Sequence, residues 1–459
     1  MFNTTYSIVF QAHFDQLLNP AHELVQLARK LNWGRFEAGF ARCYTPEMGA
    51  PAKATRLLVG LQYLKYTFNE SDESVVARWV ENPYWQYFCG YTHLQHECPI
   101  HPSSMTRWRK RVGAQRLEAL LHETIALAQR DGHVSQTELE RVNVDTTVQE
   151  KNITYPTDSK LLYKAIQKLV GAARSRGLAL RQSYLRVGKN AAIQVSRYAH
   201  ARQFQRMRRS LRKLRTYAGR LIRDIRRKVG APDDELATLL QRADRVRQQQ
   251  PHDTHKLYSL HEPEVQCISK GKAHKRYEFG QKVAIATTHR GNWIVGAKLL
   301  PNNPYDGHTL AETLTTVESV TGVAVTAAYV DKGYRGHGYV GPTSVHVAGQ
   351  RSANRSRSER RRRRRRSAIE PKIGHLKSDH RMDRCFLTGL AGDAINAVLA
   401  AAGSNLRKLL GRLAAALISW RHVFAARLPT LRLAARTARI LRAPTPEVTA
   451  AHARLRLCA

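Results

Sequence analysis

Three acidic residues in distant parts of the chain have the positions that a shared metal site requires. Asp145 stands in an alternating strand pattern and faces away from its neighbouring valines. Asp331 ends a buried apolar strand, and ligand sites in open α/β sheets lie at that edge. Glu370 begins a helix after seven consecutive arginines. Carboxylate oxygens suit hard divalent cations, and two such ions can hold both reacting oxygens of a phosphodiester. Spacing alone leaves their convergence open.

The surroundings of Glu370 allow two interpretations. The four residues 367–370 form a capping-box pattern, which would place Glu370 at the third helical position. Metal binding is compatible with that cap, because both interpretations place Glu370 at a helix start. Lys377 follows about two turns later, on nearly the same face, where it would point toward a bound phosphate. The arginine run is either a flexible basic segment or a contact to phosphate, and Arg366 is the member that we expect to act.

Two other polar groups have simpler explanations. Asp306 and His308 could assist a site, but their Asp-Gly-His-Thr sequence favours a loop and a helix cap. A group of cysteines and histidines between positions 89 and 101 has ligand types that suit zinc. Its spacing matches no common zinc motif, so ordinary loop and core residues are favoured.

The overall charge predicts a polyanionic partner. The 459 residues include 75 Lys+Arg against 36 Asp+Glu, a net charge of +39, and nucleic acid is the commonest partner for such a balance. An anionic membrane is the rival, but no apolar run approaches the roughly 18–20 residues of a span. Six scattered cysteines do not suit a disulfide framework. With no export signal, these features predict a cytoplasmic protein without membrane contact.

The elements that must position the three acids divide the chain into three parts. Residues 1–135 are predicted to form an all-α DNA-binding domain, which could be of helix-turn-helix type. Residues 136–410 are predicted to form an α/β domain, and 411–459 a basic tail. The strand and helix order of 136–410 is compatible with a ribonuclease-H-like mixed sheet. The predicted DNA contacts of the first part are Arg107, Arg109, Lys110 and Arg111.

A large basic helical insert, at about 160–255, interrupts the α/β domain. Residues 171–230 hold 18 Lys+Arg and one acid, Asp224. An apolar stripe that begins at Phe204 shows that this segment packs on something while it presents a cationic face. Its expected DNA contacts are Arg208, Arg209, Arg212, Lys213 and Arg215.

Four segments together resemble the bacterial insertion-sequence transposases of the family-five type, which belong to the DDE class. They read VNVDTTVQEKNITYPTDSKLL, YSLHEPEVQCISKGKAHKRYEFGQKVAIATT, AYVDKGYRGHGY and RRRRSAIEPKIGHLKSDHRMDRCFL, and the likeness runs from about 15 to 405. The resemblance implies that Asp145, Asp331 and Glu370 are the acidic triad. A related Tyr-Arg-Glu-Lys signature falls on Arg366, Glu370 and Lys377, with Arg363 in place of the tyrosine.

The resemblance implies a function as well as a site. It predicts a transposase that binds the terminal inverted repeats of its element, cuts there and joins the ends to target DNA. It further implies Mg²⁺ or Mn²⁺ at the triad, DNA contacts from Arg363, Arg366 and Lys377, and at least a dimer in the synaptic complex. Two alternatives remain: a metal-dependent endonuclease without strand transfer, and a non-catalytic DNA-binding protein derived from an inactive copy.

Overall fold

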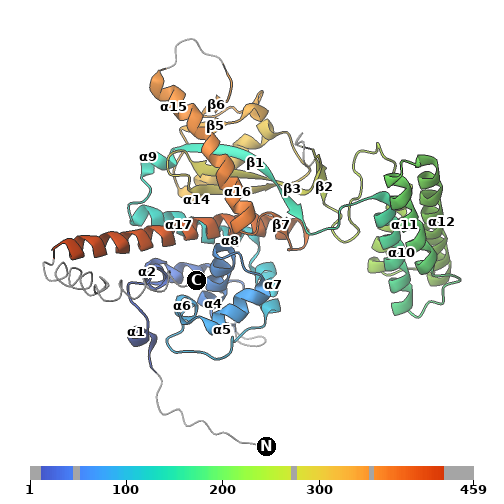
Figure 1. Ribbon diagram of the computed structural model, residues 1–459, viewed down its shortest axis with the longest axis horizontal. Coiled ribbons are helices and arrows are strands. Elements are labelled where there is room, and N and C mark those ends of the chain that lie inside the picture. The colour runs from blue at the N-terminus through green and yellow to red at the C-terminus, as the bar shows by residue number, and fades with distance from the viewer. Residues whose placement is uncertain (1–11, 45–51, 270–275, 351–355, 428–459) are drawn as a thin grey trace, which may run out of the picture.

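The computed structural model describes residues 12–44, 52–269, 276–350 and 356–427, with side chains up to 416 (Figure 1). Its N-terminal part is helical, as predicted. The helices are α1 (Phe14–Leu17), α2 (Glu23–Lys30), α3 (Trp33–Ala41), α4 (Thr55–Thr67), α5 (Asp72–Glu81), α6 (Pro83–Phe88), α7 (Pro102–Val112), α8 (Ala114–Arg130) and α9 (Gln136–Leu139). Residues 89–101 separate α6 from α7. This segment is far longer than the three- or four-residue turn of a helix-turn-helix. These two helices therefore do not form that motif.

A mixed sheet forms the centre of the molecule. Its strands are β1 (Arg141–Lys151), β2 (Gln266–Ile268), β3 (Glu278–Thr288), β4 (Ile294–Leu300), β5 (Ala327–Val330), β6 (Ser344–Val347) and β7 (Arg384–Cys385). The order through the sheet is β4-β3-β1-β5-β6, with β2 on β3 and β7 on β1. β5 and β6 run parallel to β1, whereas β3 is antiparallel to both β1 and β4. β3 and β4 form a hairpin across Arg290 and Gly291.

The valines of β1 and Asp145 lie on opposite faces of the sheet, because successive side chains of a strand point to opposite faces. Val142 and Val144 are fully buried in the main hydrophobic core, whereas Asp145, which follows them, is only partly buried. This alternation is the one that the sequence predicts. It turns the Asp145 carboxylate away from the packed side of the sheet.

The remaining helices close the α/β part. They are α14 (Leu310–Thr321), α15 (Arg357–Arg365), α16 (Ile369–Asp379) and α17 (Gly389–Arg427), with short 3-10 helices at Asp306–Thr309, Lys332–Tyr334 and Arg366–Ala368. α17 runs between the sheet and the N-terminal helices (Figure 1). It continues past the predicted start of the tail at 411, so that boundary falls inside a helix. Residues 428–459 lie outside the described part of the chain.

The N-terminal helices and the sheet share one hydrophobic core, which extends from Leu24 to Leu413. Asn405 of α17 hydrogen-bonds to the backbone of Ile294 in β4 and to Thr124 in α8. Gly403 lies so close to α4 that an added Cβ would stand 2.6 Å from the Tyr66 carbonyl carbon. Residues 12–135 are therefore part of the same packed unit as the sheet, rather than a separate domain.

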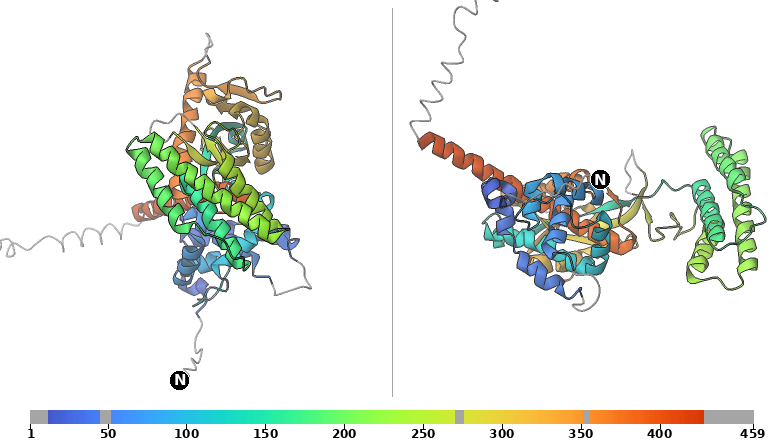
Figure 2. Two further views of the ribbon diagram at one scale, coloured as in Figure 1. Left: turned by 90° about the vertical axis from the view of Figure 1, so that its right-hand side faces the viewer. Right: turned by 90° about the horizontal axis from the view of Figure 1, so that it is seen from below.

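The predicted insert is a four-helix bundle with a hydrophobic core of its own. Its helices are α10 (Asp158–Ser175), α11 (Leu185–His200), α12 (Phe204–Val229) and α13 (Asp234–Gln248). Figures 1 and 2 show the bundle standing to one side of the sheet. Leu214, Leu221 and Ile225 are buried as the apolar stripe predicts. Phe204 is 52% exposed, because it is the first residue of α12 and lies at the end of the bundle.

Candidate active site

Asp145 and Asp331 stand on adjacent parallel strands at the same level. The register pairs Val142 with Ala328 and Asn143 with Tyr329. Asp145 lies two residues beyond Asn143, and Asp331 lies two residues beyond Tyr329. Because side chains two apart on a strand share a face, the two carboxylates lie side by side at the carboxyl end of β5. The chain folds this way because each aspartate follows an apolar stretch that pairs within the core.

Asp306 is a third carboxylate in this region, and the sequence-based interpretation of it as a helix cap is wrong. Its Oδ1 accepts hydrogen bonds from Lys282 Nζ at 2.9 Å and from Thr146 Oγ1 at 3.0 Å, instead of capping its own helix. A Cβ on Gly333 would lie 3.0 Å from Asp331 Oδ1 and 3.3 Å from Asp306 Oδ2. The glycine therefore allows the two carboxylates to approach the same backbone position. The ring of His308 packs against the ring of Tyr305.

The charges of these acids affect a buried tyrosine, Tyr334. Tyr334 is fully buried, and the pKa of its hydroxyl is raised first by burial and then by the negative charges of three aspartates. In order of effect these are Asp306, Asp145 and Asp331. All three carboxylates are therefore near enough to the Tyr334 hydroxyl to act on its ionisation. Only the partners of Asp306, and not its sequence context, could have identified it.

Glu370 is joined to this group through Arg366. The Arg366 side chain is 16% exposed, and its Nη2 lies 3.0 Å from Glu370 Oε1. Its Nη1 lies 3.9 Å from Asp145 Oδ2. One guanidinium thus stands between the first and third predicted members of the triad, and it neutralises part of the charge of both.

Ser367 and Glu370 do not form the predicted capping box. Ser367 Oγ donates to the carbonyl of Arg364, and the N-cap of α16 is Ala368, without a side-chain cap. The reason is that α15, the 3-10 turn at 366–368 and α16 follow one another directly, so no free helix start exists at Ser367. Glu370 is the second residue of α16, and its side chain is 59% exposed.

The donor set suits a hard cation, because aspartate and glutamate oxygens are the ligands that Mg²⁺ takes. Within the described ranges, however, no group of three or more His, Cys, Asp or Glu side chains is arranged to hold a metal ion. Asp145, Asp306 and Asp331 gather at the sheet edge, whereas Glu370 is turned to Arg366. A metal shared by Asp145 and Glu370 therefore requires the Arg366 side chain to move from between them.

The other residues near the site that are predicted to contact DNA interact with other parts of the protein. Lys377 Nζ lies 3.9 Å from Glu278 Oε1 on β3, with the two side chains 19% and 5% exposed. Arg363 donates to the carbonyl of Val347 and contacts His346, so it fastens α15 to β6. Neither residue is placed as a freely projecting cation.

Of the predicted DNA contacts on α7, one is corrected. Arg109 is 2% exposed, and its guanidinium donates to both carboxylate oxygens of Asp72 and to Gln62. It is a core residue, because helical periodicity turns it toward α4 and α5. Arg107, Lys110 and Arg111 are exposed.

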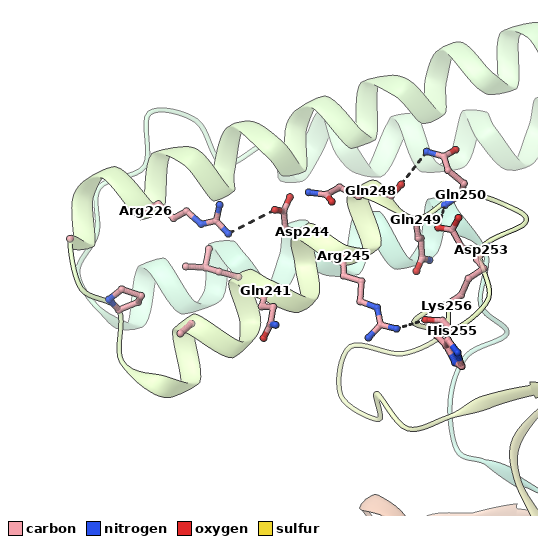
Figure 3. A pocket seen from close by; sticks show the side chains of 14 residues that line it. Arg226, Gln241, Asp244, Arg245, Gln248, Gln249, Gln250, Asp253, His255 and Lys256 are labelled. Atoms are coloured by element: carbon pink, nitrogen blue, oxygen red, sulfur yellow. Dashed lines mark hydrogen bonds and ion pairs between the residues drawn. The ribbon is translucent and has the colours of Figure 1, made fainter. Parts of the chain in front are cut away.

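The basic face of the insert is mostly as predicted. Arg208, Arg209, Arg212 and Lys213 are exposed along α12. Arg215 differs, because it is half-buried and donates to the carbonyl of Gln249. The insert also holds a polar cavity of about 960 Å³, where Arg226 faces Asp244 and Arg245 faces the His255 backbone (Figure 3). None of the predicted site residues lines it.

Comparisons with known proteins match two parts of the chain to transposase domains. A Transposase domain (DUF772) model matches residues 12–111, and a Transposase DDE domain model matches residues 342–410, which include Arg366, Glu370 and Lys377. These two domain matches indicate a transposase, and the second domain is of the DDE type. A relative of this transposase in Rhizobium meliloti, an uncharacterized protein ORF8 in the nfe locus, is 54% identical over 196 residues, which are 43% of this chain and 94% of the relative. No solved structure matches the chain.

One further property concerns membranes. Among the described helices of the transposase, none combines the length and the apolar character that crossing a membrane demands.

Proposed function

We propose that this transposase, of the insertion-sequence family-five type, binds the terminal inverted repeats of its element, cleaves there and joins the 3′ ends to target DNA. The observation that carries the proposal is the gathering of Asp145, Asp306 and Asp331 at one sheet edge, with Arg366 linking Asp145 to Glu370. The basic faces of α7 and α12 supply the cations that a DNA substrate requires.

The strand order supports a ribonuclease-H-like catalytic core. Three long strands, β4, β3 and β1, form an antiparallel meander, and β5 and β6 continue parallel to β1. The insert enters between β1 and β3, at the end of β1 remote from the hairpin. This arrangement presents Asp145 from the central strand and Asp331 from its parallel neighbour.

The acids and the arginine would have separate roles. Asp145, Asp331 and Glu370 would hold Mg²⁺ or Mn²⁺, which when bound activates the attacking water or 3′-hydroxyl and stabilises the pentacoordinate phosphate. Lys282 and Thr146 hold Asp306 in place beside Asp331. Arg366, displaced from Glu370, would donate to a non-bridging phosphate oxygen, since a guanidinium fork matches phosphate geometry.

The proposed reaction determines the oligomeric state and the substrate. Two element ends must be brought together, so at least a homodimer is proposed for the synaptic complex. The substrate is double-stranded DNA, and the proposed place of action is the nucleoid of the bacterial cytoplasm.

Cleavage and joining of labelled element ends test the proposal. Asp145→Asn, Asp331→Asn and Glu370→Gln should each abolish both reactions while end binding is kept, because the carboxylates hold metal and the cationic faces hold DNA. Ca²⁺ should support binding but not chemistry. Retained joining in any variant would remove that residue from the site.

The two alternatives give other results. An endonuclease without strand transfer would cut intact ends but fail to join pre-cut ends. An inactive copy would bind ends and do neither, with any divalent metal.

A further inference from the structure

A cavity of about 580 Å³ lies at the start of β1, four residues before Asp145, where α9, the β3–β4 turn and α15 meet. Its wall contains five arginines and one acid, Glu138. The arginines are Arg141, Arg290, Arg361, Arg362 and Arg365. We infer that this cavity is a binding site for a backbone phosphate of the DNA, at a fixed distance from the bond that is cut. The inference rests on the proposed function for its substrate.

The positive charges in the cavity wall are not balanced by ion pairs within the described ranges. Among the described residues, none of the five arginines forms an ion pair with a carboxylate. Arg365 donates to the carbonyl of Arg290, which holds α15 against the hairpin turn. Glu138 Oε1 accepts a hydrogen bond from Thr288 Oγ1, at 3.0 Å. Guanidinium groups crowded in this way repel one another, and an anion with several acceptor oxygens removes that repulsion.

A buried histidine in the cavity wall supplies a second, independent observation. His289 is 6% exposed, and its ring is stacked on Tyr329 with centroids 4.2 Å apart. Its Nδ1 lies 2.7 Å from the side-chain amide of Asn143, whereas its Nε2 is buried without a hydrogen-bond partner among the described residues. A buried ring nitrogen without a partner costs stability, and a phosphate oxygen at the cavity would satisfy it.

The histidine need not be charged to do this. Burial, followed by the charges of Arg365, Arg362 and Arg141, lowers the pKa of His289 to about 4. The ring is therefore neutral near pH 7 and carries one N–H. With Asn143 Oδ1 facing Nδ1, that hydrogen is on Nδ1; a flip of the Asn143 amide turns its nitrogen toward Nδ1 and moves the hydrogen to Nε2, from which it can be donated to an anion.

The cavity lies at a set distance from the carboxylates. Arg141 precedes Asp145 by four residues on one strand, which is about 13 Å at 3.3 Å per residue. Arg365 is directly next to Arg366 in the chain. The bound phosphate would therefore lie at a fixed place on the duplex, within a few base steps of the scissile one.

The experiment is a scan of element-end DNA in which single phosphates are replaced by neutral methylphosphonates, with affinity measured in Ca²⁺. For the unmodified transposase, neutralising one particular phosphate within a few steps of the cut should weaken binding about tenfold. In the double variant Arg361→Ala/Arg365→Ala, the same replacement should change binding less than twofold, because this variant no longer holds that phosphate.

The matched control is Arg360→Ala/Arg364→Ala, two exposed arginines of the same helix that lie outside the cavity wall. It should keep the tenfold sensitivity, with an unchanged melting temperature in both double variants. Equal sensitivity of both variants at every phosphate would overturn the inference. Cleavage of unmodified ends by the unmodified protein is scored separately. Its absence would sink the proposed function, while the binding scan would still decide the phosphate site.

Discussion

Arg366 Nη2 and Glu370 Oε1 are 3.0 Å apart across one turn at the start of α16. The pair holds Glu370 against Arg366, whose other terminal nitrogen lies 3.9 Å from Asp145 Oδ2. Glu370 is thus oriented by an arginine and not by a helix cap. The orientation of the Glu370 carboxylate therefore depends on the positive charge of Arg366.

Removal of the Arg366 guanidinium should reduce catalysis more than affinity. Arg366→Ala should slow joining of pre-cut ends by two to three orders of magnitude, since a cation removed from beside a reacting phosphate is worth ~3–4 kcal/mol. Affinity for ends should fall less than tenfold. The measurement is single-turnover joining at saturating protein, with Arg364→Ala, an exposed arginine near the end of α15, as the control. Equal losses of rate and affinity would assign Arg366 to general DNA attraction.

Lys377 requires a test that separates stability from chemistry, because it faces the buried Glu278. Lys377→Ala should lower the free energy of unfolding by ~1–3 kcal/mol, since it takes a cation away from a buried carboxylate. The double variant Lys377→Ala/Glu278→Gln should recover the melting temperature yet still join slowly. If the joining rate recovers together with the melting temperature, Lys377 is a structural partner of Glu278 and no part of the reaction.

Arg109 should behave as a core residue. Arg109→Ala should destabilise the protein by ~1–3 kcal/mol, because it removes buried hydrogen bonds to Asp72 and Gln62, while Lys65 still neutralises Asp72. Lys110→Ala, one residue further on the exposed side, should leave stability within ~0.5 kcal/mol and weaken DNA binding. Melting temperature and end affinity, measured for both, check this. Weaker end binding by Arg109→Ala with normal melting would instead place Arg109 in the DNA interface.

The same pair predicts a loss of stability in acid. Burial would raise the pKa of Asp72, but hydrogen bonds from Arg109 and the charge of Lys65 lower it to about 2, from 3.8. A lowered folded-state pKa means stability that is complete above pH 4 and is lost as the pH falls toward 2. The contribution is about 2 kcal/mol. Asp72→Asn should remove this part of the acid dependence in urea unfolding curves.

The bundle arginines should contribute attraction without sequence preference. A combined Arg208→Gln/Arg209→Gln/Arg212→Gln variant should reduce the slope of log K against log salt by ~0.9 for each phosphate that the protein no longer neutralises. The ratio of end to random DNA affinity should stay unchanged. Arg215→Gln is the control, because Arg215 closes the bundle onto Gln249 and should alter melting more than the slope. A fall in the affinity ratio would mean that α12 reads bases.

The elements of the site were predictable because each rests on local patterns. The valines around Asp145 and the apolar strand before Asp331 reflect periodicity, and both strands form as predicted. The partners were not predictable, since Asp306 meets Lys282 and Thr146 across long sequence separations. The burial of Arg109 was likewise not predictable from the sequence. Arginine side chains are usually exposed, and the ion pair with Asp72 explains why this one is buried.

The central place of α17 has a consequence for how the chain is made. Its residues 395–413 complete the core that Leu24 begins, so the N-terminal helices cannot cover their apolar faces until almost the whole polypeptide has left the ribosome. The bundle from 158 to 260 is continuous in sequence and can fold earlier. A message cut short before α17 therefore yields a folded basic bundle attached to an unfinished core that proteases can digest.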